Sequence, residues 1–258
     1  MSETVLVTGG AGDIGRALAR RFLAGGHRVV LFDRDGTALE GAARDIVGGD
    51  RLVCITADVT DSASIGEAVT RAEAAFGPIG VLVNNAGGVI APTLASTDEA
   101  AWLADLDLNL NGAWRCVRAV QDGMMMRRRG IIINISSANA TGIYGYPAYS
   151  SAKAGLEHFT RFLAVELGRH GIRANAIAPG SVRTQAWNER VAQDPEILER
   201  VKRWYPLGEV CEPEDVAGLA AFLVSPDARM ITGAVIALDG GLTAGSTTMA
   251  REFCGAEF

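Results

Sequence analysis

Short apolar runs alternate with longer segments of helical length along most of the chain. The apolar runs carry Val, Ile and Leu at consecutive positions, which is typical of strands covered on both faces. They span residues 4–8, 28–32, 51–56, 79–83, 130–135, 172–177 and 233–238. Segments that fit helices lie between them, at 15–25, 37–47, 62–76, 99–126, 148–169 and 213–225. Because alternating strands and helices need crossover connections, the pattern predicts a single α/β domain on a doubly wound parallel sheet of about seven strands, with helices on both faces.

Two segments depart from this alternation. Residues 184–212 mix aromatic and charged side chains, and so long a connection in a compact α/β domain is more typical of a lid than of a plain linker. The tail at 243–258 contains Phe253 and Phe258. It is either a disordered end or a segment that docks on a neighbouring subunit, and we favour docking. The catalytic domain is thus expected to span 1–242.

Composition and charge exclude several classes of protein. The 258 residues are 48% apolar and 21% charged, which is a globular balance. The net charge of −6, with Arg127–Arg129 as the one basic run, argues against nucleic acid as a partner. No apolar stretch reaches the roughly 20 residues that span a bilayer, and a strand-like run from Thr4 leaves no room for a signal peptide. We therefore expect a soluble, cytoplasmic protein with no membrane partner.

The cysteines give no sign of a metal site. Cys54, Cys116, Cys211 and Cys254 lie far apart in the sequence, without the paired spacing that metal ligands show. We expect reduced thiols and no bound metal.

A glycine-rich turn follows the first strand, with the sequence TGGAGDIG at residues 8–15. Glycines between a strand and a helix let the backbone approach a pyrophosphate, which then meets the amides and the positive dipole end of the helix. Asp33 ends the second strand 18 positions after Gly15, close to the spacing of about 20 expected for a carboxylate that binds a ribose 2′-hydroxyl. The arrangement predicts a Rossmann-type dinucleotide site.

Asp33 also bears on which dinucleotide binds. A carboxylate there accepts hydrogen bonds from a free 2′-hydroxyl and repels a 2′-phosphate, which favours NAD over NADP. Arg34 favours NADP instead, because a guanidinium pairs with a phosphate. No basic residue lies in the glycine-rich turn to support it, so NAD is the expected cofactor and NADP the alternative.

Six short motifs in order resemble those of the classical short-chain dehydrogenases/reductases. They are the glycine-rich turn, Asn84-Asn85-Ala86-Gly87, Asn109-Leu110-Asn111-Gly112, Ser137 ahead of Tyr149-Ser150-Ser151-Ala152-Lys153, Pro179-Gly180 with Thr184, and Asp239-Gly240-Gly241. The resemblance runs from about residue 4 to 242. It implies an oxidoreductase whose catalytic set is Asn109, Ser137, Tyr149 and Lys153. For the cofactor it implies contacts from Gly9, Asp13, Ile14, Gly15, Asp33, Asp58, Val59, Asn85, Ala86, Gly87, Tyr149, Lys153, Pro179, Gly180, Val182 and Thr184.

Residue chemistry independently supports this catalytic set. Tyr149 and Lys153 are four residues apart, so they share one face of a helix. An ammonium beside a phenol favours phenolate, so we expect Lys153 to lower the pKa of Tyr149 towards that of a general base. Tyr149 then takes the hydroxyl proton as hydride leaves the alcohol carbon, or returns it in reduction. The resemblance adds that Lys153 binds the nicotinamide ribose and that Asn109 supports a proton relay through water.

Ser137 is expected to hydrogen-bond the substrate oxygen and fix its orientation. Ser136 is the rival for this role. The interval from Ser137 to Tyr149 is 12 residues, one shorter than in many relatives, which makes Ser136 an alternative, and Ser137 remains the favoured serine.

Asp13 departs from the family pattern, which usually has glycine at this place in the turn. A carboxylate near a pyrophosphate is unfavourable unless its side chain turns away, whereas at a helix start a negative side chain gains ~0.3–1 kcal/mol. We expect cofactor binding to survive, with Asp13 and Ile14 contributing through their backbone.

Substrate contacts are expected from the loop after Ser137 and from the lid, with Ser137, Asn139, Tyr144, Tyr149 and Trp187 as the candidate residues. The leading hypothesis is an NAD-dependent secondary-alcohol dehydrogenase or ketone reductase. The alternatives are an NADP-dependent 3-oxoacyl-type reductase and, from another class, a non-catalytic NAD-binding sensor or scaffold. The sequence identifies a small-molecule substrate without naming it.

The helix predicted at 148–169 is apolar around much of its circumference. A helix with two apolar faces buries one against the sheet and the other against something else. Together with the family resemblance, this predicts a homo-oligomer, a tetramer or a dimer.

Overall fold

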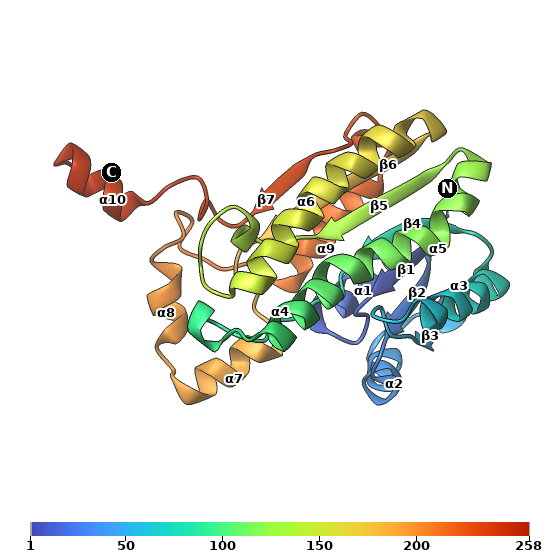
Figure 1. The fold of residues 1–258 in the computed structure, drawn as a ribbon, viewed down its shortest axis with the longest axis horizontal. Coiled ribbons are helices and arrows are strands. Elements are labelled where there is room, and N and C mark those ends of the chain that lie inside the picture. Colours follow the sequence, from blue (N-terminus) through green and yellow to red (C-terminus); the bar gives the residue numbers. More distant parts are fainter. Residues whose placement is uncertain (1, 258) are drawn as a thin grey trace.

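The seven apolar runs form the strands of one parallel sheet in a computed structural model, which describes residues 2–257 (Figure 1). The strand order is β3-β2-β1-β4-β5-β6-β7. Their bounds are β1 Thr4–Thr8, β2 Arg28–Asp33, β3 Leu52–Thr56, β4 Ile79–Asn84, β5 Gly130–Ile135, β6 Ile172–Pro179 and β7 Val235–Leu238. The order reverses direction between β1 and β4, so a crevice opens there at the carboxyl ends of the strands, where such folds bind ligands. The prediction of a doubly wound sheet is confirmed.

Helices cover both faces of the sheet, because successive strand residues point to opposite sides. Val5 and Val7 face a core shared with α1 (Asp13–Ala24), α2 (Gly36–Asp45) and α9 (Pro213–Val224). Leu6, between them, faces a second core. That core is shared with α3 (Ser62–Phe76), α5 (Gly112–Arg127) and α6 (Pro147–Leu167). These two layers hold the carboxyl ends of the strands in fixed register.

The segment expected as one helix at 99–126 is broken in the middle. It consists of α4 (Glu99–Leu106), a π-helical turn (Asp107–Asn111) and α5. The side-chain Nδ2 of Asn109 donates to the carbonyl of Asp105, four residues earlier, at 2.9 Å. A side-chain donor on a helix carbonyl competes with the backbone ladder and bends the helix. Apolar spacing carries no mark of this turn, which explains why the sequence predicted a continuous helix.

The segment at 184–212, for which the sequence predicts a lid, and the tail both contain helices. The 184–212 segment holds α7 (Gln185–Gln193) and α8 (Ile197–Lys202). The tail forms α10 (Thr247–Cys254), which extends away from the body of the molecule (Figure 1). Phe253 is exposed on it, while Phe258 lies outside the described residues. Across residues 2–257, no helix has the length and apolar character needed to cross a membrane.

Candidate active site

The glycine-rich turn lies at the switch between β1 and β4 and has room for backbone only. Gly9 has φ of +64°, and a Cβ there would approach the Cα of Ala86 to 2.9 Å. Asn85 fastens the two segments together, because its Nδ2 donates to the carbonyls of Thr8 at 2.9 Å and Gly9 at 3.1 Å. A Cβ on Gly15 would collide with the carbonyl of Gly9. The turn is thus a cradle that fits a pyrophosphate.

Asp33 lies at the carboxyl end of β2, beside a pocket suited to an adenosine. Its Oδ2 accepts from the amide of Ala11 at 3.1 Å and its Oδ1 from that of Asp35 at 3.2 Å. Arg34 also lines this pocket. The full lining is Gly9, Phe32, Asp33, Arg34, Ala57, Asp58, Val59, Ala86, Gly87 and Leu108. The carboxylate is therefore held at the pocket wall by the nucleotide turn itself.

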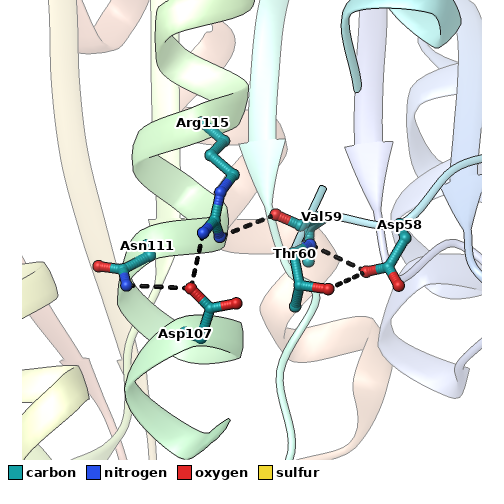
Figure 2. Close-up of polar contacts among 6 residues, drawn as sticks. All are labelled: Asp58, Val59, Thr60, Asp107, Asn111 and Arg115. Carbon is teal, nitrogen blue, oxygen red and sulfur yellow. Dashed lines mark hydrogen bonds and ion pairs between the residues drawn. The ribbon is translucent and has the colours of Figure 1, made fainter. Parts of the chain in front are cut away.

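Asp58 and Val59, which also line this pocket, are linked by polar contacts to the π-helical turn (Figure 2). Asp58 accepts from the amide of Thr60 at 2.9 Å and from its hydroxyl at 2.7 Å, and these bonds lower the pKa of Asp58. Arg115 on α5 reaches across to the carbonyl of Val59 at 3.4 Å and pairs with Asp107 at 2.7 Å. Burial alone would raise the pKa of Asp107, but the hydrogen bonds and charge of Arg115, with a bond from Asn111, lower it.

Tyr149 and Lys153 lie on one face of α6, beside the end of β5. The Lys153 Nζ is 5.5 Å from the centre of the Tyr149 ring and donates to the carbonyl of Ile135 at 2.8 Å. The Ser137 hydroxyl lies close enough to the Tyr149 side chain to lower its pKa. Ser136 instead donates to the Glu157 carboxyl at 2.9 Å, in the buried layer behind the site. Ser137 is therefore the serine that faces Tyr149.

Burial decides the titration of this pair. It raises the pKa of Tyr149, with the Ser137 hydrogen bond lowering it and the charge of Asp105 raising it further. Burial also lowers the pKa of Lys153 to about 8. The expected lowering of the Tyr149 pKa is wrong for the chain alone, because burial disfavours the phenolate and the charge of Asp105 adds to that effect.

Asn109 closes the inner end of the site. Its Nδ2 donates to the carbonyl of Gly88 at 2.9 Å, and its Oδ1 accepts from the Gly88 amide at 3.2 Å. A Cβ on Gly87 would lie 2.8 Å from the Asn109 Oδ1 and 3.3 Å from the Lys153 Nζ. The π-helical turn, the loop after β4 and α6 thus converge on Gly87.

Asp105 is a residue beside the site that sequence reasoning missed. It is 1% exposed, and neither of its carboxyl oxygens has a hydrogen-bond partner of normal geometry among the described residues. Burial raises its pKa, and the nearby amide of Ile90 only partly offsets this. The sequence offers one sign that Asp105 lies near the site. It is four residues before Asn109, which places both residues on one face of a helix.

The loop after Ser137 is braced internally. Asn139 donates from Nδ2 to the carbonyl of Gly145 at 3.1 Å and to the hydroxyl of Ser150 at 3.2 Å. Tyr146 immediately precedes α6 with φ of +57°, and its amide donates to Pro92 at 2.9 Å. A left-handed backbone is costly for a residue with a Cβ, so this bend is held by its surroundings. Tyr144 is partly exposed on the same loop.

The turn after β6 carries Pro179, Gly180, Val182 and Thr184 to the start of the lid. Val182 pairs with Cys211 in a single parallel bridge, which joins the two ends of the lid. Thr184 immediately precedes α7 and makes no side-chain capping bond.

The lid aromatics have different surroundings. Tyr205 is buried, its hydroxyl accepts from the Ser181 amide at 2.8 Å, and a Cβ on Gly180 would lie 2.9 Å from its ring. It is a structural support of the turn. Trp187 on α7 stacks with Arg190, whose guanidinium lies 4.3 Å from the ring centre.

Asp13 is the first residue of α1, and its carboxylate turns to the lid. The Oδ2 accepts from the amide of Gln185, the first residue of α7, at 2.7 Å. Asp13, Ile14 and Gly15 line one side of a groove whose other side includes Thr184 and Gln185. The described residues contain no cluster of His, Cys, Asp and Glu side chains that would hold a metal ion.

A doubly wound sheet, a glycine cradle at its switch point and a Tyr–Lys pair beyond it define a dinucleotide-dependent oxidoreductase. The chain belongs to the classical short-chain dehydrogenase/reductase family. A family model described as enoyl-(acyl carrier protein) reductase matches residues 9–243. A solved oxidoreductase of the short chain dehydrogenase/reductase family from Burkholderia thailandensis is 46% identical, with a TM-score of 0.94 over 100% of this chain and 99% of that one.

Two further relatives differ in what their names state. Galactitol 2-dehydrogenase (L-tagatose-forming) from Cereibacter sphaeroides is 37% identical over 92% of this chain and 93% of its own length. A variant of actinorhodin polyketide ketoreductase, solved with NADPH, is 32% identical, with a TM-score of 0.89 over 95% of this chain and 98% of that one.

Proposed function

We propose that the chain is an NAD-dependent dehydrogenase of secondary alcohols, or the corresponding ketone reductase, with Tyr149 as general acid/base. The observation that carries the proposal is the placement of Tyr149 between the Ser137 hydroxyl and the buried Lys153, whose Nζ lies 5.5 Å from the Tyr149 ring centre. A phenol aligned by a serine is the group that exchanges a proton with a substrate oxygen. The bound nicotinamide supplies the chemistry of accepting hydride from the alcohol carbon or returning it to a ketone.

The chain's own residues divide the remaining work. The turn with Gly9, Ile14 and Gly15 holds the pyrophosphate through its backbone, and Asp33 accepts from the adenosine ribose. Ser137 orients the substrate oxygen towards the Tyr149 hydroxyl. Lys153 binds the nicotinamide ribose, and Asn109 orders water that replenishes the proton. These roles extend to Asp58, Val59, Asn85, Ala86, Gly87, Pro179, Gly180, Val182 and Thr184 as the remaining cofactor contacts.

The substrate is covered by the lid at 184–212, with Asn139, Tyr144 and Trp187 nearest to it. Hydroxyl groups and aromatic faces in this set suit a polyol, a sugar or a cyclic alcohol, and a relative that is named a galactitol dehydrogenase is consistent with that class. Asn139 has already committed both amide hydrogens to its own loop. We therefore assign its Oδ1 as the atom left for a substrate hydroxyl.

The test is a fluorescence titration of the purified protein with NADH and NADPH in parallel, followed by a screen of polyols, sugars and cyclic alcohols with NAD. Tight NADH and weak NADPH are expected. In Tyr149→Phe we expect no turnover and an NADH Kd within a few-fold of wild type. Retained turnover in this variant would remove Tyr149 as the acid/base, and failure to bind either dinucleotide would favour a protein without dehydrogenase activity.

An NADP-dependent reductase of 3-oxoacyl compounds is the second candidate. Arg34 lines the adenosine pocket and is the observation that favours it, and one relative was solved with NADPH. Tighter binding of NADPH than of NADH in the same titration would select this candidate.

The assembly we propose is a homo-oligomer, a tetramer or a dimer. Phe162 and Val165 on α6 and Trp114 on α5 are exposed, and both helices pack against the same core on one face of the sheet (Figure 1). Docking of the 243–258 tail on a neighbouring subunit belongs to the same proposal, as its helix α10 has no buried residue. A monomeric mass by light scattering would refute it. The cytoplasmic location stays a prediction.

A further inference from the structure

The lid segment has two legs: the first is α7, and the second is α8 with the chain up to Tyr205. The two legs are attached to the domain very differently. The second leg leads through α8 to Tyr205, which is buried and accepts from the amide of Ser181. Lys202 at the end of α8 pairs with Glu199 at 3.2 Å and Glu209 at 3.5 Å. The first leg is α7, which has no buried residue along its nine positions. Neither α7 nor α8 contains a buried residue. The second leg is anchored after α8 by the buried Tyr205, whereas α7 has no buried anchor of its own.

The start of α7 also lacks the usual local support. The first amides of a helix have no partner within the helix and are normally capped by the side chain before it. Thr184 occupies that place and makes no such bond. The amide of Gln185 is instead bound by Asp13, 172 positions earlier in the sequence, at 2.7 Å. A carboxylate at this end of a helix also meets the positive end of the helix dipole.

Asp13 is placed to do this because of where α1 begins. Within the glycine-rich segment 8–15, Gly12 is the last residue before α1 and Asp13 is the first residue of the helix. Its carboxylate crosses the mouth of the groove whose opposite side is formed by Thr184, Gln185 and Ala186. The residue that departs from the family's glycine is thus the one that connects the nucleotide turn to the lid.

We propose that Asp13 is a positioning residue that latches α7, and with it the lid, to the nucleotide turn. The latch fixes the start of α7 over the groove before substrate arrives. It also directs the negative charge of Asp13 to the α7 amide, away from the pyrophosphate cradle. The kinetic consequence, a lower KM for the alcohol, rests on the proposed dehydrogenase function. The structural consequence, a closed lid, does not.

Limited trypsin digestion of the protein without added ligand tests the latch directly, because Arg190 lies within α7 and opening of the lid exposes the bond after it. Asp13→Ala removes the acceptor and keeps a good helix former. Gln185→Pro removes the donor from the other side. Proline is tolerated at the first helical position, and Thr184, with φ of −112° and ψ of 174°, already has the extended backbone that precedes proline. Gln185→Ala keeps the amide and serves as the matched control.

We expect Asp13→Ala to accelerate cleavage after Arg190 about two- to fivefold, the range for a charge at a helix terminus. The same substitution in the Gln185→Pro background should change the rate by less than about 1.5-fold, since contacting partners are not additive. Gln185→Ala alone should cleave like wild type. An equal acceleration by Asp13→Ala in both backgrounds, or none in either, would overturn the latch.

Steady-state kinetics give the second readout. Asp13→Ala is expected to raise the KM for the alcohol several-fold, with a smaller change in kcat. If the protein turns over no alcohol at all, the proposed function fails while the digestion still decides whether the latch exists. If the alcohol is turned over and the digestion rates show no coupling between Asp13 and Gln185, the latch alone fails.

Discussion

Asp107 and Arg115 form an ion pair of 2.7 Å across the π-helical turn that carries Asn109 (Figure 2). The same guanidinium reaches the carbonyl of Val59 at the adenosine pocket. One side chain therefore joins the wall of the cofactor pocket to the helix irregularity that positions a proposed catalytic residue. The irregular turn is stabilised from outside its own backbone.

Arg115→Met should lower the stability of the protein by about 1 kcal/mol at pH 7, because the pair is only partly shielded from water. The pKa of Asp107 is lowered in the folded state. The stability that the ionised Asp107 contributes to the folded protein is thus present above the unfolded pKa of about 3.9, and it is lost as pH falls through the lower folded pKa. Urea unfolding at pH 7 and at about pH 2.5, below the unfolded pKa, measures the difference between variant and wild type, which should shrink at the lower pH. Arg118→Met, an exposed position on the same helix, is the control, and an equal loss there would contradict the assignment.

Asp33→Ser should reverse or abolish the preference for NADH. The variant removes the acceptor for the ribose 2′-hydroxyl and the charge that repels a 2′-phosphate, and leaves Arg34 in place. The ratio of the NADPH Kd to the NADH Kd should fall by about tenfold or more, the worth of one hydrogen bond to a charged group. Parallel fluorescence titrations measure it. Asp35→Asn removes a neighbouring charge while keeping a capping side chain on α2, and a similar fall there would attribute the preference to the general field instead.

The kcat/KM of alcohol oxidation should rise between pH 7 and 9, whereas the kcat/KM of ketone reduction should not. The pKa of Tyr149 is raised by burial, so the phenolate needed for oxidation becomes more populated as pH increases, while the phenol needed for reduction is present throughout. An oxidation rate that falls from pH 7 to 9 would rule out this account of Tyr149.

Asp105→Asn should stabilise the protein at alkaline pH. A carboxyl whose pKa is raised in the folded state destabilises it above the unfolded value of about 3.9, increasingly as pH rises to the folded value. A buried amide avoids the cost of a buried charge. Urea unfolding should show a gain of about 1 kcal/mol at pH 8 that diminishes at pH 5. Asp122→Asn, at an exposed position on α5, should show no such trend, and a pH-independent gain at Asp105 would contradict the prediction.

Much of the architecture could be predicted from the sequence because it depends on local patterns. Val5 to Val7 face alternate cores, as a continuous apolar run between turns requires. The order of the motifs also brings Ser137, Tyr149 and Lys153 together, since each lies at the end of a strand or on the next helix.

The parts that could not be predicted depend on contacts between distant segments. The π-helical turn arises from one side-chain bond of Asn109, and the Asp13–Gln185 contact joins residues 172 positions apart. Tyr205 lies in the lid segment and is buried against Gly180 in the fold, a contact that the sequence does not indicate. The pKa of Tyr149 follows from burial, which no spacing of residues encodes.

The left-handed backbone of Tyr146 has a consequence for how new substrate ranges arise. It follows Gly145, whose φ is +88°, and the bend is held by bonds to Pro92 and through Asn139. An insertion or deletion in the loop before α6 would have to restore each of these bonds and still leave Tyr149 at the same position on α6. Helix α7 buries nothing and tolerates exchange at most of its positions. Diversification among close relatives should therefore concentrate in 185–193, and the loop from Ser137 to Tyr146 should change slowly.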